Sequence, residues 1–269
     1  NTAYILSIGN GDSSRIYKTT DGGKTWTLQF KNTNEKAFFD ALACRDRGNC
    51  LALSDPLDGK FLLLGPKRGG LLARGARPEL AAGFEDYGGP EAKDGEAAFA
   101  ASGTCLVTQG LYKTFIVSGG KHARVFQRED DGAWTISEPG FAAGSTGSGI
   151  FSVAMFDLKN GVIVGGDYEK PDEAKNNLAF TSDGGRTWKL GSGLNGYRSS
   201  VSYASKNILV AAGTNGSDIS YDGGLHWEGV DKENYNAVQA KSTASIWAVG
   251  PKGRVAQLPI ITLIKSRKN

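Results

Sequence analysis

The sequence predicts an all-β fold, a β-propeller built from four-stranded blades. The chain has 38 Gly against 8 Pro and 1 Met, and its apolar segments are short and broken by Gly, Asn, Asp or Ser. Such punctuation is typical of many short strands joined by tight turns. In addition, one pattern recurs at Thr19 to Trp26, Thr181 to Trp188 and Ser220 to Trp227. Repetition at this scale indicates a repeat architecture, here one domain over residues 1–269.

Each copy of the pattern predicts a turn followed by a strand. An Asp is preceded two residues earlier by Ser or Thr and followed by Gly-Gly. The carboxylate can accept backbone N–H bonds, the hydroxyl can tie the same turn, and Gly-Gly supplies positive φ without strain. The closing Trp can anchor the outgoing strand by burying its ring. We therefore interpret six residues as structural rather than catalytic: Asp21, Trp26, Asp183, Trp188, Asp222 and Trp227.

The strands around these turns divide the chain into six blade-like units. The clearest unit has strands at 150–156, 162–166, 178–182 and 187–190. The first unit starts at what should be its second strand, so either residues 260–264 supply the missing strand or the protein has more sequence upstream and seven blades. Residues 75–96 are expected to form a loop between blades, and 259–269 a closing strand or a basic tail. The six units span 3–30, 38–74, 99–136, 150–190, 199–230 and 237–258.

Composition argues against several classes of function. The near balance of 31 basic and 28 acidic residues does not indicate a basic surface for binding nucleic acid. No apolar run approaches the ~18 residues of a membrane span. The only histidines, His122 and His226, make a catalytic triad or a multi-histidine metal site improbable. No cofactor is expected, although the acidic loop 55–58 leaves Ca²⁺ binding open. We expect a monomer.

The three cysteines bear on whether the protein works in an oxidising cellular compartment. Cys44 and Cys50 flank a turn-like pentapeptide between two apolar runs, so they either form a disulfide across a hairpin or remain two thiols on neighbouring strands. A disulfide would imply an oxidising, exported compartment. Cys105 is expected to pack as a small buried hydrophobe.

Blade geometry predicts where a binding site would lie. Alternate connections in a four-stranded blade emerge at the same end, so the Asp-Gly-Gly turns lie opposite the loop after the second strand and the link to the next blade. Charged and polar side chains that converge at this end can bind a polar ligand or carry out general acid–base chemistry. Individually, Asp55 and Asp167 can also cap Gly-rich turns, and Arg198 can pair with one of them to orient the links. The candidates at this opposite end are Asp55, Glu96, Asp167, Tyr168 and Arg198.

The repeated turn resembles the Asp-box, or BNR repeat. Over nearly its whole length the chain resembles the branch related to the photosystem II stability and assembly factor, the Ycf48-like family. The resemblance rests on residues 6–9 before the first box, 54–56, 96–104, 165–168 and 197–199. It implies a seven-bladed, non-enzymatic assembly factor in an exported or lumenal compartment. The second unit, however, lacks a box.

Two functions follow from these observations. The first is a non-catalytic scaffold that holds a protein partner through the five candidate residues. The second is a glycosidase that uses paired carboxylates such as Asp55 and Asp167. Sialidase activity is disfavoured, because the chain lacks the N-terminal arginine motif of sialidases. A propeller without any ligand is a third possibility.

Overall fold

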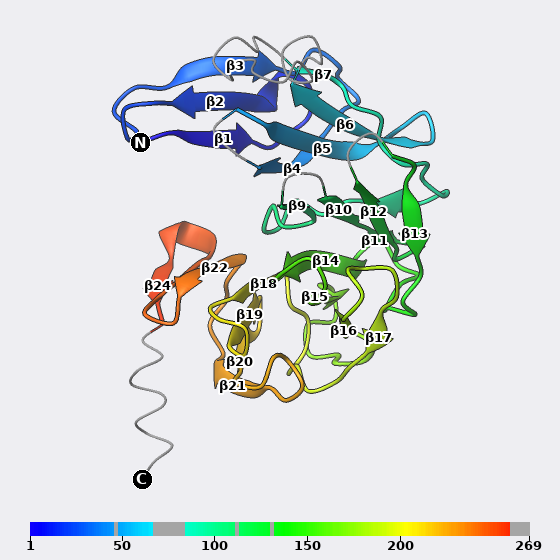
Figure 1. Cartoon of the computed structure of the whole chain (residues 1–269), viewed down its shortest axis with the longest axis vertical. Helices are drawn as coiled ribbons and strands as arrows, with labels where there is room; N and C mark the ends of the chain where they lie inside the picture. Colours follow the sequence, from blue (N-terminus) through cyan, green and yellow to red (C-terminus); the bar gives the residue numbers. More distant parts are fainter. Residues whose placement is uncertain (46–47, 67–83, 111–112, 130–131, 259–269) are drawn as a thin grey trace.

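The computed structural model describes residues 1–45, 48–66, 84–110, 113–129 and 132–258. Within them the chain forms six small antiparallel sheets, the arrangement of a six-bladed β-propeller (Figure 1). This confirms the predicted fold and the six units. We name the sheets blades A to F in chain order. The predicted strand at 260–264 lies outside the described residues.

Blades A, B and C come from the first half of the chain. Two of them have four strands and blade A has three. Blade A contains β1 (Ala3–Ser7), β2 (Arg15–Thr19) and β3 (Thr27–Lys31); blade B contains β4 (Phe39–Cys44), β5 (Cys50–Leu57), β6 (Lys60–Pro66) and β7 (Phe84–Asp86); blade C contains β9 (Leu106–Gln109), β10 (Lys113–Val117), β12 (Val125–Glu129) and β13 (Thr135–Ser137).

Blades D, E and F follow in the second half of the chain. The short strands β8 (Glu96–Ala97) and β11 (Gly119–Gly120) extend the sheet of blade D at its inner edge. Blade D contains β14 (Ser148–Met155), β15 (Gly161–Asp167), β16 (Leu178–Thr181) and β17 (Lys189–Leu190); blade E contains β18 (Ser200–Tyr203), β19 (Leu209–Gly213), β20 (Gly216–Ser220) and β21 (Glu228–Asp231); blade F contains β22 (Ala237–Ser242), β23 (Ser245–Val249) and β24 (Val255–Gln257).

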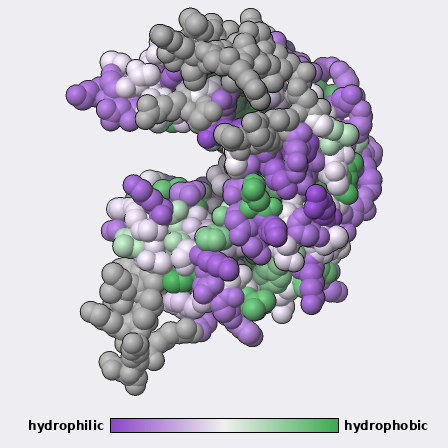
Figure 2. Space-filling view, in the orientation of Figure 1, coloured by the Kyte–Doolittle hydropathy of each residue, from purple (hydrophilic) through white to green (hydrophobic). Residues whose placement is uncertain are grey.

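The hydrophobic core lies between neighbouring blades. Ile16 and Phe39 join blades A and B, Phe61 and Phe115 belong to a larger cluster of blades B, C and D, and further clusters join D to E and E to F. Strand alternation produces this pattern, because one face of each blade packs on the blade before it and the other on the blade after it. Figures 1 and 2 show that the ring is open between blades A and F.

Blade B differs from the sequence expectation. We placed its last strand before residue 74 and a loop over 75–96, but Phe84–Asp86 forms β7, paired with β6. The segment from 67 to 83 lies outside the described residues. This blade has no Asp-Gly-Gly turn, so no local motif marks where its fourth strand starts.

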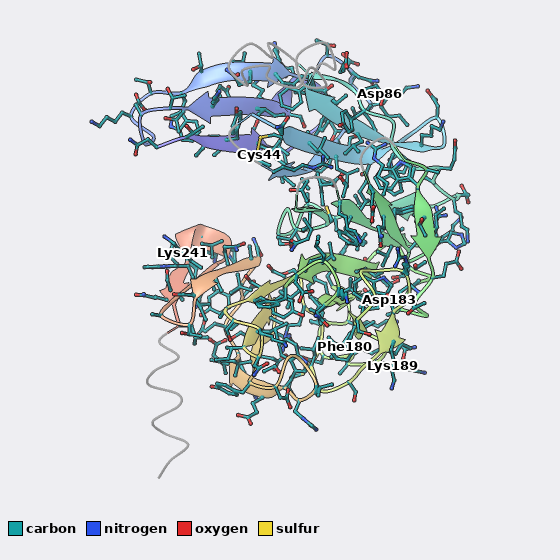
Figure 3. All side chains as sticks on the ribbon, viewed as in Figure 1. Cys44, Asp86, Phe180, Asp183, Lys189 and Lys241 are labelled. Carbon is teal, nitrogen blue, oxygen red and sulfur yellow. A yellow bond between two sulfur atoms is a disulfide. The ribbon has the colours of Figure 1, made fainter. Side chains whose placement is uncertain are left out.

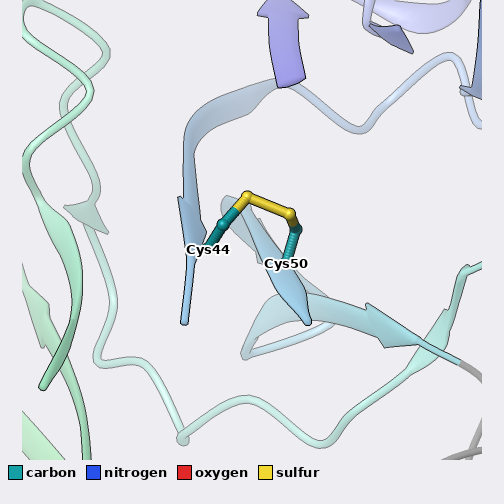
Figure 4. The surroundings of a disulfide bond; sticks show 2 residues. All are labelled: Cys44 and Cys50. Carbon is teal, nitrogen blue, oxygen red and sulfur yellow. A yellow bond between two sulfur atoms is a disulfide. The ribbon is translucent and has the colours of Figure 1, made fainter. Parts of the chain in front are cut away.

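The hairpin of β4 and β5 carries the disulfide. Cys44 and Cys50 are paired across the two strands, with Cα atoms 3.9 Å apart, and their sulfurs are bonded (Figure 4). Cys105 is a free, fully buried thiol. The structure therefore has the disulfide that the turn-like spacing suggested.

Candidate functional site

The three repeated turns have one hydrogen-bond pattern. In blade D the Asp183 carboxylate accepts bonds from Thr187 N–H (3.0 Å), Thr187 Oγ1 (2.6 Å) and Thr181 Oγ1 (2.8 Å). These donors lower the pKa of Asp183 to about 2. Asp21 and Asp222 accept the equivalent bonds in blades A and E. The carboxylates hold the turns together, as expected from the sequence. We call this end of the propeller the turn face.

The opposite end, which we call the loop face, carries the five candidate residues. Asp55 lies near the end of β5, Asp167 is the last residue of β15, and Tyr168 begins the connection of β15 to β16. Glu96 and Arg198 lie on the links that precede the inner strands of blades C and E. The topology therefore puts all five at the end of the blades opposite the Asp-Gly-Gly turns.

Glu96 is buried in an ion pair with Arg124, a residue that the sequence analysis missed. Arg124 Nε donates to Glu96 Oε1 over 2.8 Å, and Arg124 Nη2 donates to Oε2. Ser118 Oγ and the Lys93 N–H also donate to this carboxylate. The Glu96 side chain is fully buried. Because its oxygens are already occupied, Glu96 fixes the link between blades B and C.

Arg198 forms a second buried ion pair, with Asp218 of β20. Its Nε and Nη2 lie 2.7 and 2.6 Å from Asp218 Oδ2, and its Nη1 donates to Tyr197 O and Asn215 Oδ1. Asp218 also accepts two bonds from Asn195. The sequence suggested Asp55 or Asp167 as the partner of Arg198, but the partner is Asp218. The pair orients the link between blades D and E.

Asp55 is half-buried and lies beside the buried acid Asp40. Its Oδ1 accepts a 2.9 Å bond from Ala98 N–H, which ties blade B to the link that follows it. Burial raises the pKa of Asp55. Burial and the nearby Asp55 charge raise the pKa of Asp40 to about 9, so Asp40 is protonated at neutral pH. Asp40 Oδ2 has no hydrogen-bond partner among the described residues.

Asp167 and Tyr168 follow one another at an open cavity, Asp167 as a buried residue in its wall and Tyr168 as an exposed one. Asp167 accepts bonds from Ser145 Oγ (3.1 Å) and Glu169 N–H (3.0 Å) and lines an open cavity of about 360 Å³. The Tyr168 side chain is 45% exposed. Its ring contacts Phe151 at 6.3 Å and Tyr197 at 6.5 Å between centroids. The cavity is also lined by Ser145, Ser148, Lys170, Glu173, Lys175 and Asn176.

The five residues do not share one cavity. Arg198 lines a separate cavity of about 530 Å³, together with Asp172, Asn215 and Lys232. Asp55 and Glu96 line neither of the two. The structure thus divides the set into three residues that hold loops in place, Asp167, a buried residue that lines an open cavity, and Tyr168, which is exposed.

The sequence contains a signal for one of the two partners that were not predicted, Asp218. Asp218 comes just before the turn at Ser220 to Trp227, where the clearest unit has its strand 178–182, and a charged side chain buried in a strand needs a partner of opposite charge. The described ranges contain no group of three or more His, Cys, Asp or Glu side chains that could hold a metal ion. Within the same residues, no helix has the length and hydropathy needed to cross a membrane.

Comparison with known proteins finds similarity in structure only. No family model and no curated protein matches the sequence. A solved structure of YCF48 bound to D1 peptide aligns over 96% of both chains, with 15% identity and a TM-score of 0.43. A structure of U3-55K aligns over 91% of this chain and 72% of that one, with 9% identity and a TM-score of 0.56. TolB from Acinetobacter baumannii aligns over 96% of this chain and 61% of its own, with 8% identity and a TM-score of 0.60. At these identities, the likeness to U3-55K and TolB shows a shared fold alone.

Proposed function

We propose that this propeller is a non-catalytic scaffold that binds a protein partner through its loop face. The observation that carries the proposal is Tyr168, an exposed aromatic ring beside a cavity lined by charged side chains of both signs. Exposed Tyr supplies large contact area, and it is enriched among residues that dominate binding energy in protein interfaces. Charged neighbours such as Lys170 and Glu173 suit the polar rim of such an interface.

The surrounding loops are well suited to this role because they are fixed before any partner arrives. The buried pairs Glu96–Arg124 and Arg198–Asp218 hold the links on either side of blades C and D. Phe151, stacked on Phe99 at 3.8 Å, supports the Tyr168 ring from below. A surface that loses little conformational freedom on binding retains more of its contact energy.

The three turns and the disulfide support a more detailed proposal. We assign the turns at Asp21, Asp183 and Asp222 as Asp-boxes, on the basis of their common hydrogen-bond pattern. The protein is proposed to work in an exported compartment, because disulfides such as Cys44–Cys50 persist in oxidising surroundings. Paired-acid glycoside hydrolysis has no such support, since Asp167 lines the cavity of about 360 Å³ and Asp55 does not.

The test uses matched exposed aromatics at the two ends of the blades. Tyr168 is 45% exposed on the loop face, and Phe156 is 38% exposed at the turn between β14 and β15, on the turn face. Wild type, Tyr168→Ala and Phe156→Ala are used as bait for quantitative affinity capture from the source cells. A direct binding titration with the captured partner then follows.

We expect wild type and Phe156→Ala to bind one partner alike, with Tyr168→Ala weaker by about tenfold or more, since a hot-spot truncation costs at least ~2 kcal/mol. Equal binding by Tyr168→Ala, with its circular dichroism and unfolding midpoint unchanged, would overturn the proposal. So would loss of the partner from Phe156→Ala alone.

A further inference from the structure

A second cavity on the loop face lies between blades D and E, separate from the cavity beside Tyr168. Its volume is about 530 Å³, which falls in the range of about 300 to 1,000 Å³ typical of ligand sites. The two blades are joined by an apolar cluster to which Phe180 of β16 belongs (Figure 3). We call this space the D–E cavity. It is lined by Asp172, Asn195, Arg198, Asn215, Asp218 and residues 229–232.

The two buried charges in the wall of the D–E cavity, Arg198 and Asp218, satisfy each other. Arg198 Nε and Nη2 lie 2.7 and 2.6 Å from Asp218 Oδ2. Arg198 Nη1 donates to Tyr197 O and Asn215 Oδ1, and Asn195 Nδ2 donates to Asp218 Oδ1 over 2.6 Å. A buried pair of this kind adds no net charge to the cavity. The more exposed groups at its edge therefore determine which ligand it attracts.

The remaining charges of the D–E cavity are mainly acidic. They are two carboxylates, those of Asp172 and Asp231, and one ammonium group, that of Lys232. Asp172 and Lys232 are exposed, and Asp231 is half-buried. Within the described residues none of the three forms an ion pair. Two acids against one base leave an excess of negative charge at the cavity, in a chain whose formal net charge is +3.

Hydrogen bonds hold both carboxylates in position. Asn215 Nδ2 donates to Asp172 Oδ1 over 2.8 Å, and the Glu233 N–H donates to Asp231 Oδ1 over 3.1 Å. The Tyr235 hydroxyl donates to Asp231 Oδ2 over 3.4 Å. Because each carboxylate oxygen has two lone pairs, both groups keep capacity for a further donor. Two preformed acceptors at one cavity suit a ligand that carries several donors.

A short, fixed stretch of chain joins the D–E cavity to the exposed ring of Tyr168. The Tyr168 ring contacts the Tyr197 ring at 6.5 Å between centroids, and the next residue, Arg198, lines the D–E cavity. Pro171 O accepts bonds from the Tyr197 N–H (2.8 Å) and from Asn215 Nδ2 (2.7 Å). A partner bound at Tyr168 can therefore also reach the D–E cavity, and the loop between them is already in place.

We propose that the D–E cavity receives an arginine side chain of the protein that the loop face binds. The inference rests on the proposed function and adds the chemistry of the partner, whose contacting segment is basic. A guanidinium group keeps its charge and has five donors in a planar fork, so it can donate to more than one acceptor in the cavity at once. Arginine is also enriched among the residues that dominate binding energy in protein interfaces.

Two other kinds of ligand fit the D–E cavity less well. Within the described residues no group of His, Cys, Asp and Glu side chains could hold a metal ion, so the cation expected here is organic. An acidic side chain would meet Asp172 and Asp231, with only Lys232 to pair with. Like charges brought together in this way oppose binding.

The experiment uses N-acetyl-arginine methylamide as a probe of the cavity in the full chain. The matching lysine, glutamate and norleucine derivatives are the comparison ligands. Binding is followed by chemical shifts in nuclear magnetic resonance, including those of the side-chain amides of Asn195 and Asn215. The protein variants are the double substitution Asp172→Asn with Asp231→Asn and, as a control at an exposed acid on the loop face of blade B, Asp58→Asn. Asn keeps an acceptor oxygen and removes the charge.

We expect the arginine derivative to shift both side-chain amides and to bind about threefold more tightly than the lysine derivative or better. The glutamate and norleucine derivatives should leave these shifts unchanged. The double substitution should weaken binding of the arginine derivative by about fivefold or more, because two charge contacts are lost, and Asp58→Asn should not. The partner captured by wild type should lose affinity for the double variant by a similar factor. Tyr168→Ala should leave binding of the probe unchanged.

Three results would overturn the inference. The first is the absence of a saturable shift with the arginine derivative, or equal shifts with the glutamate or norleucine derivative. The second is equal binding of the captured partner by wild type and the double variant, with the unfolding midpoint unchanged. The third is a dimer in sedimentation experiments that the double substitution abolishes, which would assign the cavity to a second copy of this chain. Loss of the partner from the double variant but not from Tyr168→Ala would contradict the role of Tyr168 and support the D–E cavity.

Discussion

The Arg198–Asp218 pair gives the sharpest test of what holds the loop face together. Both side chains are almost fully buried, and the Asp218 carboxylate accepts bonds from Arg198 and Asn195. Arg198→Met leaves a buried carboxylate without its counter-charge, and Asp218→Leu leaves a buried guanidinium. Breaking one partner of a buried pair costs about 3 to 5 kcal/mol. In a chain of this length each loss should lower the melting temperature by roughly 10 °C.

The double variant separates pairing from simple loss of packing. With both charges removed, the remaining cost is mainly that of polar neighbours such as Asn195 and Asn215 left without partners, about 1 to 3 kcal/mol. We therefore expect Arg198→Met with Asp218→Leu to lose less stability than either single variant, measured by urea denaturation as a double-mutant cycle. Arg15→Met, at the exposed pair with Asp12, is the control and should leave the midpoint unchanged.

The reasoning would be refuted by two results. One is a loss below about 1 kcal/mol in each single variant, which would mean that water reaches the pair. The other is a double variant whose loss equals the sum of the singles, which would mean that the two charges do not interact.

Three further predictions concern the buried acid Asp40, the Cys44–Cys50 disulfide, and the tryptophans that follow two of the repeated turns. The folded chain keeps a proton on Asp40 up to a pKa of about 9, whereas the unfolded chain releases it above about pH 4. Stability should therefore fall as pH rises from about 4 to 9, and Asp40→Asn should flatten that slope in urea titrations at several pH values. Replacing Cys44 and Cys50 by Ser should lower the free energy of unfolding by about 2 kcal/mol, as expected for a short closed loop, and reductant should then have no added effect on the unfolding midpoint. Trp227→Ala should cost about 3 to 5 kcal/mol in thermal or urea unfolding, and Trp26→Ala clearly less; equal losses would mean that the open side of blade A is covered in solution.

The fold was predictable from the sequence because its determinant is local and repeated. Asp183 bonds to residues within four positions of itself, so the turn can be recognised in any copy of the pattern. The fourth strand of blade B, β7, has no such turn before it, and its placement depends on pairing with β6. That strand was accordingly missed.

The candidate site was predictable in its position but not in its internal contacts. Strand order alone places Asp55, Asp167 and Arg198 at one end of the blades. Which acid meets Arg198 depends on side chains that come together only when blades D and E pack, and Asp218 is 20 residues away in the sequence. The neutral state of Asp40 likewise follows from burial against Asp55, a tertiary property.

The opening in the ring also has a consequence for folding. Within the described residues, blades A and F each pack on one neighbouring blade, whereas every other blade packs on two. The sheets then behave as a linear array, in which stability is the sum of each unit and its nearest-neighbour interfaces. Local unfolding should start at both ends and move toward blades C and D, without requiring the whole ring to open at once. Because each of these interfaces joins blades that follow one another in the chain, the described blades can assemble one at a time.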